Sequence, residues 1–324
     1  MSNDSPVLVF FGPTASGKTG ILLELFKSTG RLQAEVISAD SMQVYRGMNI
    51  GTAKPSPQER ERLPHHLIDI RDPSQQFNAG DFIRLADEAC AQIADRGKLP
   101  VVSGGTGFYL KNFIMGLSEA PPSDKKIREK LKLEINEKGA AALMKELACG
   151  DPLSSERIHI NDEYRLLRAL EVLRSSGRPL SSFEVSAKEK RSCFRFIIIG
   201  LSRPREELYR RINLRCAEMF RRGLADEVRS LYEAGYTPDD PGLRAIGYRE
   251  FFVRADDQPD RWRLSQDIEG VQALVAQNSR RYAKRQITFF TGVCRGIEDV
   301  TWIEPGGSDA ETAERILREL DITL

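Results

Sequence analysis

The feature that most constrains this chain is a loop at residues 12–19, which reads Gly-Pro-Thr-Ala-Ser-Gly-Lys-Thr. It follows the apolar run at 7–11 and precedes a helix-like apolar stretch at 21–26. This spacing is typical of a phosphate-binding loop, because the glycines let backbone N–H groups converge on an anion at a helix N-terminus. Lys18 adds a positive charge, and the Thr19 hydroxyl suits Mg2+. The residues expected to hold a diphosphate are Gly12, Pro13, Thr14, Ala15, Ser16, Gly17, Lys18 and Thr19.

Short apolar runs and helix-like segments alternate around this loop. The runs at 7–11, 35–39, 99–103 and 194–201 read as strands, and 82–94 and 205–231 read as helices. Strands that are apolar throughout are buried on both faces, which predicts a parallel sheet between helix layers. A further strand is expected at 300–303. The predicted fold class is therefore α/β, a P-loop-type parallel sheet flanked by helices.

The alternation stops after residue 117. The next seventy or so residues are charged and helical, and a strand resumes at 194–201. An all-helical domain inserted into the α/β domain explains this order. We assign 1–115 and 193–324 to the catalytic core and 116–192 to the insertion.

Composition excludes several classes of protein. Apolar residues make up 40% of the chain and charged residues 29%, with a net charge of +1, which is ordinary for a globular protein. No apolar stretch has the length of a membrane span, and the N-terminus lacks signal-peptide features. We therefore expect a cytoplasmic protein with no membrane contact, and a monomer. The five scattered cysteines predict reduced thiols, and the pair His65-His66 has no third ligand at a spacing suited to zinc.

Two further segments are expected at the sheet edge that holds the phosphate loop. Asp40 directly follows the strand at 35–39, and ligands of open α/β sheets bind at this edge. A carboxylate there can hold Mg2+ through water or act as a general base, or it can simply cap a turn. The glycine-rich turn at 104–107 allows backbone to approach a ligand closely, and Thr106 adds a hydroxyl. No aspartate ends this strand, which argues against a motor ATPase or GTPase.

Basic residues gather in three C-terminal segments, at 203–229, 243–249 and 278–295. In the last one they alternate with Tyr282, Phe289 and Phe290, as in RNA-contacting surfaces. A solvated helix face or a basic turn explains the same spacing. The residues alone leave both interpretations open.

Taken together, the motifs resemble one family, the tRNA dimethylallyltransferases, also called tRNA isopentenyltransferases. The matching stretches are 12–19, 40–55, 64–70, 79–82, 104–110, 157–172, 244–249 and 284–288. They follow in order along nearly the whole chain. The resemblance implies transfer of a dimethylallyl group from dimethylallyl diphosphate to N6 of adenosine 37, in tRNAs that read codons beginning with U.

The resemblance also implies site roles. The phosphate loop and Mg2+ would hold the isoprenoid diphosphate, Asp40 would be the general base, and Thr106 and an arginine, for which we choose Arg215 over Arg211, would contact the diphosphate. The tRNA anticodon stem-loop would contact the inserted domain and the basic runs. The tRNA-binding residues so implied are Asp40, Ser41, Met42, Gln43, Tyr164, Arg165, Leu166, Leu167, Arg168, Arg244, Ala245, Ile246, Gly247, Tyr248, Arg249, Lys284, Arg285 and Gln286.

The chain departs from the family pattern at three places. Tyr164 stands where the family usually has Gln, Glu250 where it has Gln, and Phe289-Phe290-Thr291 where it has Trp-x-Arg. These changes affect individual RNA contacts rather than the reaction. Two other hypotheses are a small-molecule P-loop kinase that binds ATP and a non-catalytic RNA-binding protein that uses phosphates as a switch.

Overall fold

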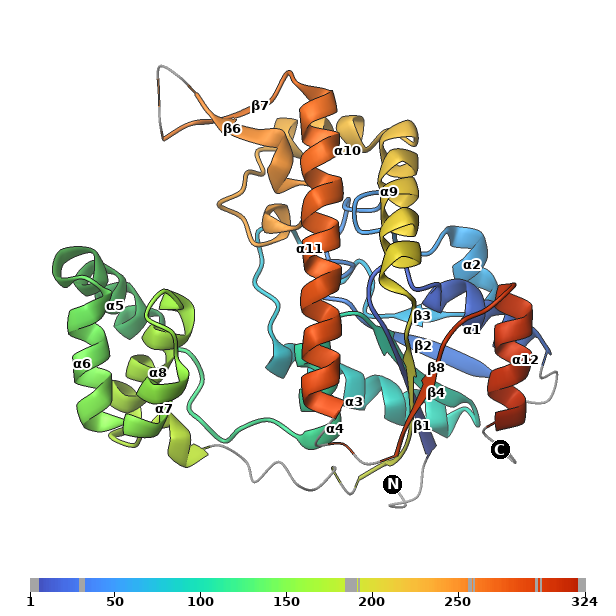
Figure 1. Ribbon diagram of the computed structural model, residues 1–324, viewed down its shortest axis with the longest axis horizontal. Helices are drawn as coiled ribbons and strands as arrows, with labels where there is room; N and C mark the ends of the chain where they lie inside the picture. The colour runs from blue at the N-terminus through green and yellow to red at the C-terminus, as the bar shows by residue number, and fades with distance from the viewer. Residues whose placement is uncertain are drawn as a thin grey trace. The chain divides into compact units, whose positions relative to one another are not determined.

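The computed structural model describes residues 6–28, 33–183, 191, 193–255, 258, 260–294, 297 and 299–319. The chain divides into two compact units (Figure 1). Unit 1 comprises Met1–Ile114 and Arg191–Leu324, and unit 2 comprises Met115–Lys190. The sequence predicted an insertion at 116–192, and residue 192 lies outside the described residues. Each unit is described below by itself.

Unit 1 is built on a parallel sheet. Within the described residues six strands pair in the order β3-β2-β4-β1-β5-β8, and every pair is parallel. They are β1 (Pro6–Phe11), β2 (Ala34–Ala39), β3 (His65–His66), β4 (Leu99–Gly104), β5 (Arg195–Leu201) and β8 (Val300–Ile303). The predicted fold class is confirmed. Strand β3 was not predicted, because two histidines carry no apolar pattern.

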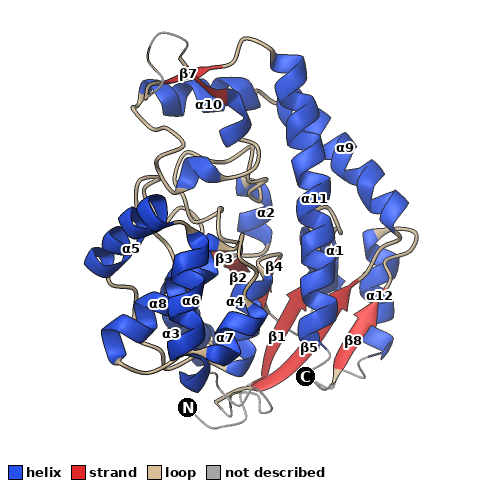
Figure 2. Cartoon of the chain, turned by 60° about the vertical axis from the view of Figure 1, so that its left-hand side comes forward, coloured by secondary structure: helices blue, strands red, loops and turns tan. Residues whose placement is uncertain are grey.

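The helices of unit 1 lie around this sheet (Figure 2). They are α1 (Lys18–Ser28), α2 (Pro57–Arg62), α3 (Ala79–Asp95), α4 (Gly107–Met115), α9 (Arg205–Arg221), α10 (Leu224–Glu233), α11 (Ile268–Cys294) and α12 (Asp309–Glu319). The sequence predicted a single helix over 205–231. That prediction was wrong, because Gly223 has a left-handed φ of 93° that ends α9 and starts α10.

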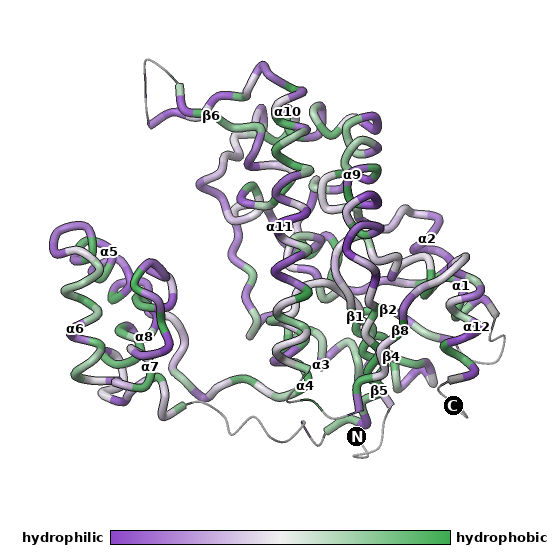
Figure 3. The backbone as a smooth tube through the Cα atoms, in the orientation of Figure 1, coloured by the Kyte–Doolittle hydropathy of each residue, from purple (hydrophilic) through white to green (hydrophobic). Residues whose placement is uncertain are grey.

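Strand alternation divides the core of unit 1 between the two faces of the sheet. On one face Leu8 and Phe10 of β1 join Ile21 of α1 and Ile316 of α12 in a buried cluster. On the other face the aromatic rings of α3, α4 and β5 pack together, for example Phe113 against Phe196 with ring centroids 5.8 Å apart. Figure 3 shows the central strands as apolar and the outer helices as mixed. The sheet is therefore rigid and buried, with its carboxyl edge left to present loops.

Irregular segments follow α10. The 3-10 turns Gly242–Arg244 and Arg249–Phe251 contain the second basic run, and β6 (Phe252–Arg254) pairs with β7 (Trp262–Leu264) as an antiparallel hairpin. This hairpin was not predicted, because its strands are only three residues long. No helix in the described part of the chain has the length and apolarity needed to cross a membrane.

Unit 2 is all-helical. It contains α5 (Lys125–Lys138), α6 (Ala140–Gly150), α7 (Pro152–Arg157), α8 (Glu163–Ser176) and the 3-10 turn Leu180–Phe183. Its apolar core includes Leu131, Leu143, Leu147 and Leu170. Glu171 is fully buried and is paired with Arg128 and Arg168, both at 3.1 Å. Unit 2 thus has a hydrophobic core of its own.

Candidate active site

The loop between β1 and α1 has the backbone shape of an anion cradle. Ala15 and Gly17 have left-handed φ values of 62° and 99°, which turn successive N–H groups inward. The Lys18 Nζ donates to the carbonyls of Gly12 and Pro13 at 2.9 and 3.0 Å, so the ammonium lies under the loop. Within the described residues, no hydrogen-bond acceptor is assigned to the N–H groups of Gly17, Lys18 and Thr19. These donors remain available to phosphate oxygens.

Three arginines hold this loop from outside. Arg203 Nε donates to the Ser16 carbonyl at 2.8 Å, Arg211 Nε to the Ala15 carbonyl at 2.9 Å, and Arg215 Nη1 to Thr14 Oγ1 at 3.1 Å. The predicted choice between Arg211 and Arg215 is therefore not exclusive, since both reach the loop. Arg203, which follows the end of β5, was not among the predicted site residues. Its proximity to the β1 loop was deducible from the pairing of β1 with β5.

The site is electropositive and desolvated. Burial and, to a smaller extent, the charge of Arg215 lower the pKa of Lys18 to about 8, although the charge of Asp40 opposes this change. Burial also lowers the pKa of Arg215, and Asp40 again opposes this change. Two cations held in such surroundings are stabilised by a bound anion. The geometry therefore favours a diphosphate at this position.

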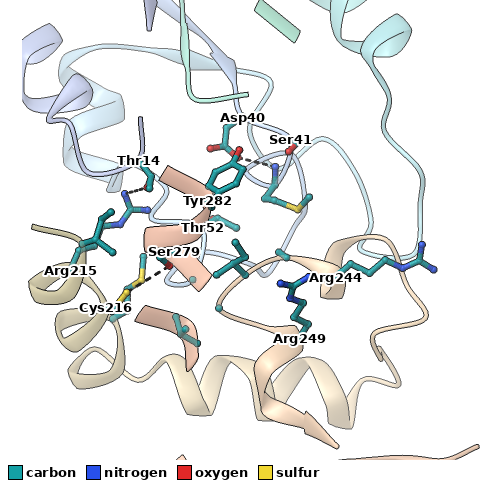
Figure 4. Close-up of a pocket in the computed structure, with 18 of the residues that line it drawn as sticks. Thr14, Asp40, Ser41, Thr52, Arg215, Cys216, Arg244, Arg249, Ser279 and Tyr282 are labelled. Atoms are coloured by element: carbon teal, nitrogen blue, oxygen red, sulfur yellow. Dashed lines mark hydrogen bonds between the residues drawn. The ribbon is translucent and has the colours of Figure 1, made fainter. Parts of the chain in front are cut away.

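Asp40 lies at the junction of two cavities. Its Oδ1 accepts hydrogen bonds from the N–H groups of Met42 at 2.9 Å and Gln43 at 3.3 Å, which fixes the carboxylate at the end of β2. A cavity of about 550 Å³ contains the phosphate loop, and another of about 290 Å³ lies beside α9 and α11. The residues that line both are Thr14, Asp40, Thr52, Arg215, Met219 and Tyr282. Figure 4 shows Asp40, Tyr282, Thr14 and Arg215 gathered on one side of the smaller cavity.

Tyr282 of α11 was not among the predicted site residues, although it is one of the aromatic residues in the basic run at 278–295. Burial and the charge of Asp40 raise the pKa of its hydroxyl to about 12, so the phenol stays protonated. It faces Asp40 in Figure 4. An aromatic ring beside a carboxylate, in a cavity open to a second one, provides a surface on which a planar base can stack.

Thr106 and Gln286 each join separate segments of the site through hydrogen bonds. Thr106 Oγ1 accepts a hydrogen bond from the Ser41 N–H at 3.0 Å, which fixes the Asp40 loop, and its expected contact with the diphosphate stays a prediction. Gln286 is only 5% exposed, and its amide bridges the Thr14 N–H at 2.9 Å and the Gly105 carbonyl at 2.7 Å. Both ends of its amide are therefore occupied within the protein, and the expected contact of Gln286 with RNA stays a prediction.

The second basic run, at 244–249, separates into exposed and buried residues. Arg244 and Arg249 are exposed, while Ala245, Gly247 and Tyr248 are buried, with Ile246 between these extremes. The side chains of Ala245 and Tyr248 are therefore buried, while Ala245, Ile246 and Gly247 line the smaller cavity. The expected RNA contacts of this run stay predictions. In the third run, Lys284 and Arg285 are exposed, and Arg285 lines the same cavity.

The loop after Asp40 meets both cavities. Ser41 and Met42 line the smaller cavity, and Gln43 lines the larger one. Gln43 Oε1 accepts a hydrogen bond from Ser38 Oγ at 2.9 Å, which orients its amide. The structure therefore brings all four residues of 40–43 to the site.

In unit 2 the predicted tRNA-binding stretch also separates into two sets. Tyr164 is 71% exposed, with the Arg128 guanidinium 4.6 Å from its ring centroid, and Arg165 is exposed beside Asp162. Arg168 is bonded to the buried Glu171 and to the Pro121 carbonyl. Leu166 and Leu167 are buried in the core of unit 2, and the expected tRNA contacts of this stretch stay predictions. The amphipathic pattern of α8 was the signal that could have separated them.

The residues present fit a magnesium ion that is carried by the substrate. Thr19 lines the cavity of the phosphate loop and offers one hydroxyl. In the described part of the chain, no group of three or more His, Cys, Asp or Glu side chains is arranged to hold a metal. Mg2+ commonly takes one or two protein oxygens and completes its octahedron with phosphate oxygens and water. The Thr19 hydroxyl would supply one protein oxygen of this kind, and the diphosphate of the substrate would supply the phosphate oxygens.

Comparison with known proteins gives one consistent result. The family model described as IPP transferase matches residues 43–293. A tRNA dimethylallyltransferase from Geobacter sulfurreducens is 42% identical over 298 residues, covering 92% of this chain and 91% of that protein. One from Geobacillus kaustophilus is 43% identical over 315 residues, covering 96% and 95%.

Solved structures agree with this result. The tRNA isopentenylpyrophosphate transferase from Bacillus halodurans matches with a TM-score of 0.65 at 36% identity, covering 98% of this chain and 97% of that one. A eukaryotic dimethylallyltransferase acting on tRNA matches with a TM-score of 0.76 at 28% identity, covering 93% and 74%. The family match spans most of the chain, and the relatives align along nearly all of it. The chain belongs to the IPP transferase family, which includes the tRNA dimethylallyltransferases.

Proposed function

We propose that this chain transfers the dimethylallyl group of dimethylallyl diphosphate to N6 of adenosine 37, in tRNAs that read codons beginning with U. The observation that carries the proposal is the shared wall of the two cavities, where Asp40 and Arg215 stand between an anion cradle and a second opening. Family membership supports the reaction type. Each substrate then enters its own cavity, and the reacting atoms meet beside Asp40.

The diphosphate occupies the larger cavity in this proposal. The N–H groups of the phosphate loop, Lys18 and Arg215 stabilise the negative charge that grows on the leaving group as the bond from C1 to oxygen breaks. When bound through Thr19, Mg2+ supplies further neutralisation of this charge. The apolar tail extends from the cradle toward the wall shared with the smaller cavity.

The adenine occupies the smaller cavity. It reaches this depth only after leaving its stack, because a base within the stacked loop presents no free amine to a buried carboxylate. N6 attacks C1, the diphosphate departs with the electron pair of the broken bond, and the N6 proton passes to the Asp40 carboxylate. The phenol of Tyr282 flanks the base.

The tRNA anticodon stem-loop is the proposed macromolecular partner. Exposed arginines, namely Arg249 and Arg285 at the smaller cavity and Arg165 in unit 2, provide charge for its phosphates. Because both cavities are built from one chain, a monomer suffices for the reaction. We propose that it works in the cytoplasm, where its acceptor is found.

A labelling experiment tests the function. The protein is incubated with Mg2+, unmodified tRNA and dimethylallyl diphosphate labelled in the isoprenoid, with a parallel reaction that contains labelled ATP and no isoprenoid. We expect label in tRNA only in the first reaction. Phosphoryl transfer from ATP to a small molecule, with no isoprenoid in tRNA, would support the kinase alternative and overturn the proposal.

A further inference from the structure

One carboxylate outside the site joins two segments that line the smaller cavity. Glu227, on α10, accepts hydrogen bonds from the backbone N–H groups of Asn49 at 2.8 Å, Ile50 at 2.8 Å and Gly51 at 3.2 Å. It also accepts one from Tyr248 Oη at 2.7 Å. These donors come from two distant parts of the chain. The carboxylate is therefore a bridge between them.

Both bridged segments form the wall of the smaller cavity. Gly51 and Thr52 contribute from the first segment, and residues 244–247 and Arg249 contribute from the second. The Tyr248 side chain packs so close to Gly51 that an ideal Cβ on Gly51 would lie 2.5 Å from a carbon of the Tyr248 ring. Only glycine at position 51 leaves room for the Tyr248 ring in this position. The separation of the segments is set by this contact and by Glu227 together.

Glu227 and the contact of Tyr248 with Gly51 and Thr52 link the two segments, and each segment also has an anchor of its own. The buried Lys54 Nζ donates to the Tyr45 carbonyl at 2.6 Å and to Asn49 Oδ1 at 3.0 Å, which fixes the first segment onto itself. Glu250, whose side chain is 4% exposed, accepts from the Gly247 N–H at 2.9 Å and from Asn278 at 2.7 Å, which fixes the second segment onto α11. Neither anchor spans the cavity.

We propose that Glu227 is a positioning residue that sets the width of the acceptor cavity opposite Asp40. The identity of the acceptor as an adenine rests on the proposed function. Loss of the carboxylate leaves backbone N–H donors unpaired, so the segment at 49–52 moves away from the turn at 244–249. The cavity then becomes wider, and the acceptor adenine can bind farther from C1 of the dimethylallyl group. A displacement of about 1 Å costs on the order of 10²-fold in rate.

The test compares E227Q and E227D with a matched control. Glutamine keeps the shape of the side chain but offers only one good acceptor atom. The control is D226N, which changes the neighbouring residue on α10, an exposed side chain paired with Arg229 at 2.7 Å. The measurements are kcat and KM for tRNA, binding of inorganic diphosphate with Mg2+, and amide hydrogen exchange at residues 49–51 without substrates.

We expect E227Q to lower kcat about 100-fold with little change in KM for tRNA or in diphosphate binding, and to accelerate exchange at residues 49–51. E227D, which retains a carboxylate, should recover part of the rate, and D226N should match the wild type. Unchanged exchange at 49–51, or a kcat within about twofold of wild type, would overturn the proposal. Diphosphate binding that is lost together with the rate would also overturn it, since Glu227 does not touch the phosphate loop.

A second variant covers the case in which E227Q fails to fold. Y248F removes only the hydroxyl and keeps the ring against Gly51, and it should give a smaller fall in kcat with faster exchange at 49–51. If Y248F is indistinguishable from wild type in both measurements, the bridge is unimportant. Should the wild type fail to modify tRNA, the proposed function fails, while the exchange comparison still decides whether Glu227 holds the two segments.

Discussion

At the scale of single residues, the proposed reaction depends most on Asp40. Its backbone contacts fix the carboxylate at the end of β2, on the wall that the two cavities share. A weak nucleophile such as an exocyclic amine needs a base at this point, because its lone pair is delocalised into the ring. The two hydrogen bonds to Oδ1 also mean that an amide in place of the carboxylate can keep the turn.

Asp40→Asn therefore separates the chemistry from the fold. We expect the variant to bind tRNA and diphosphate as the wild type does, and to lose about 10²- to 10⁴-fold in the rate of a single turnover. Rapid mixing with labelled dimethylallyl diphosphate measures this rate. A single-turnover rate close to that of the wild type would show that Asp40 does not accept the proton.

Lys18 makes the site sensitive to pH. The folded protein holds this group with a pKa of about 8, below the ordinary value of 10.5, because burial disfavours its charged form. Between these pH values the unfolded chain binds the extra proton and the folded one does not. This group therefore makes the free energy of unfolding increase as pH rises from about 8 toward 10.5.

Diphosphate has the opposite preference, since it stabilises the charged ammonium. The affinity for dimethylallyl diphosphate should accordingly fall as pH rises through about 8, and binding above that pH should take up a proton. Titration calorimetry in buffers of different ionisation enthalpy measures both effects. An affinity that stays constant from pH 7 to pH 9.5 would contradict this assignment.

At the scale of secondary-structure elements, the sequence predicted the strands that bear the site but not every helix boundary. The strands β1, β2, β4, β5 and β8 were found because each is a run of apolar residues. The break between α9 and α10 was missed because apolar spacing continues through it. The decisive feature is a backbone angle at Gly223, which spacing does not report.

Gly223→Ala tests the origin of this break. An ideal Cβ at Gly223 would meet only Asp226 Oδ2, at 3.7 Å, so the expected loss in free energy of unfolding, about 1–2 kcal/mol, comes from the left-handed φ of 93°. Gly292→Ala in α11 is the control, since nothing lies within 4 Å of its added Cβ. It should leave stability unchanged or raise it by up to about 1 kcal/mol. Urea unfolding of both variants gives the comparison, and equal effects would show that φ at Gly223 is not the cause.

The site itself was predictable only in part, and the reason is distance along the chain. The phosphate loop and Asp40 were identified because their motifs are contiguous. Arg203, Tyr282 and Glu227 act on residues far away along the chain, such as Ser16, which lies 187 residues before Arg203. A sequence motif also does not show which of its side chains are buried. Leu166 and Gln286 were therefore grouped with exposed neighbours although both are buried.

At the scale of the whole molecule, the chain combines a rigid sheet that carries chemistry with a helical unit that has its own core. The exposed Arg165 lies on the first turn of α8, and 72% of its side chain is exposed. Arg168, three residues on, is instead half-buried and bonded to Glu171. If unit 2 binds tRNA phosphates, the first arginine contributes to RNA affinity directly and the second contributes to the fold.

Arg165→Ala should therefore weaken tRNA binding, leave kcat at saturating tRNA unchanged, and reduce the slope of log affinity against log salt by about 1. Arg168→Ala should instead lower the free energy of unfolding, because it removes a partner from the buried Glu171. Filter binding across a salt series and urea unfolding distinguish the two variants. An Arg165→Ala protein with the wild-type salt slope would exclude this residue from the RNA interface.

In the proposed reaction, the phosphate loop holds an isoprenoid diphosphate while Asp40 deprotonates one particular adenosine. The most direct measurement is mass spectrometry of nuclease fragments from an unmodified tRNA that has been incubated with the protein, Mg2+ and dimethylallyl diphosphate. A tRNA with guanosine at position 37 serves as the control. We predict one dimethylallyl group on adenosine 37 and none on the control. Modification of another nucleotide, or no modification while diphosphate is bound, would contradict the account.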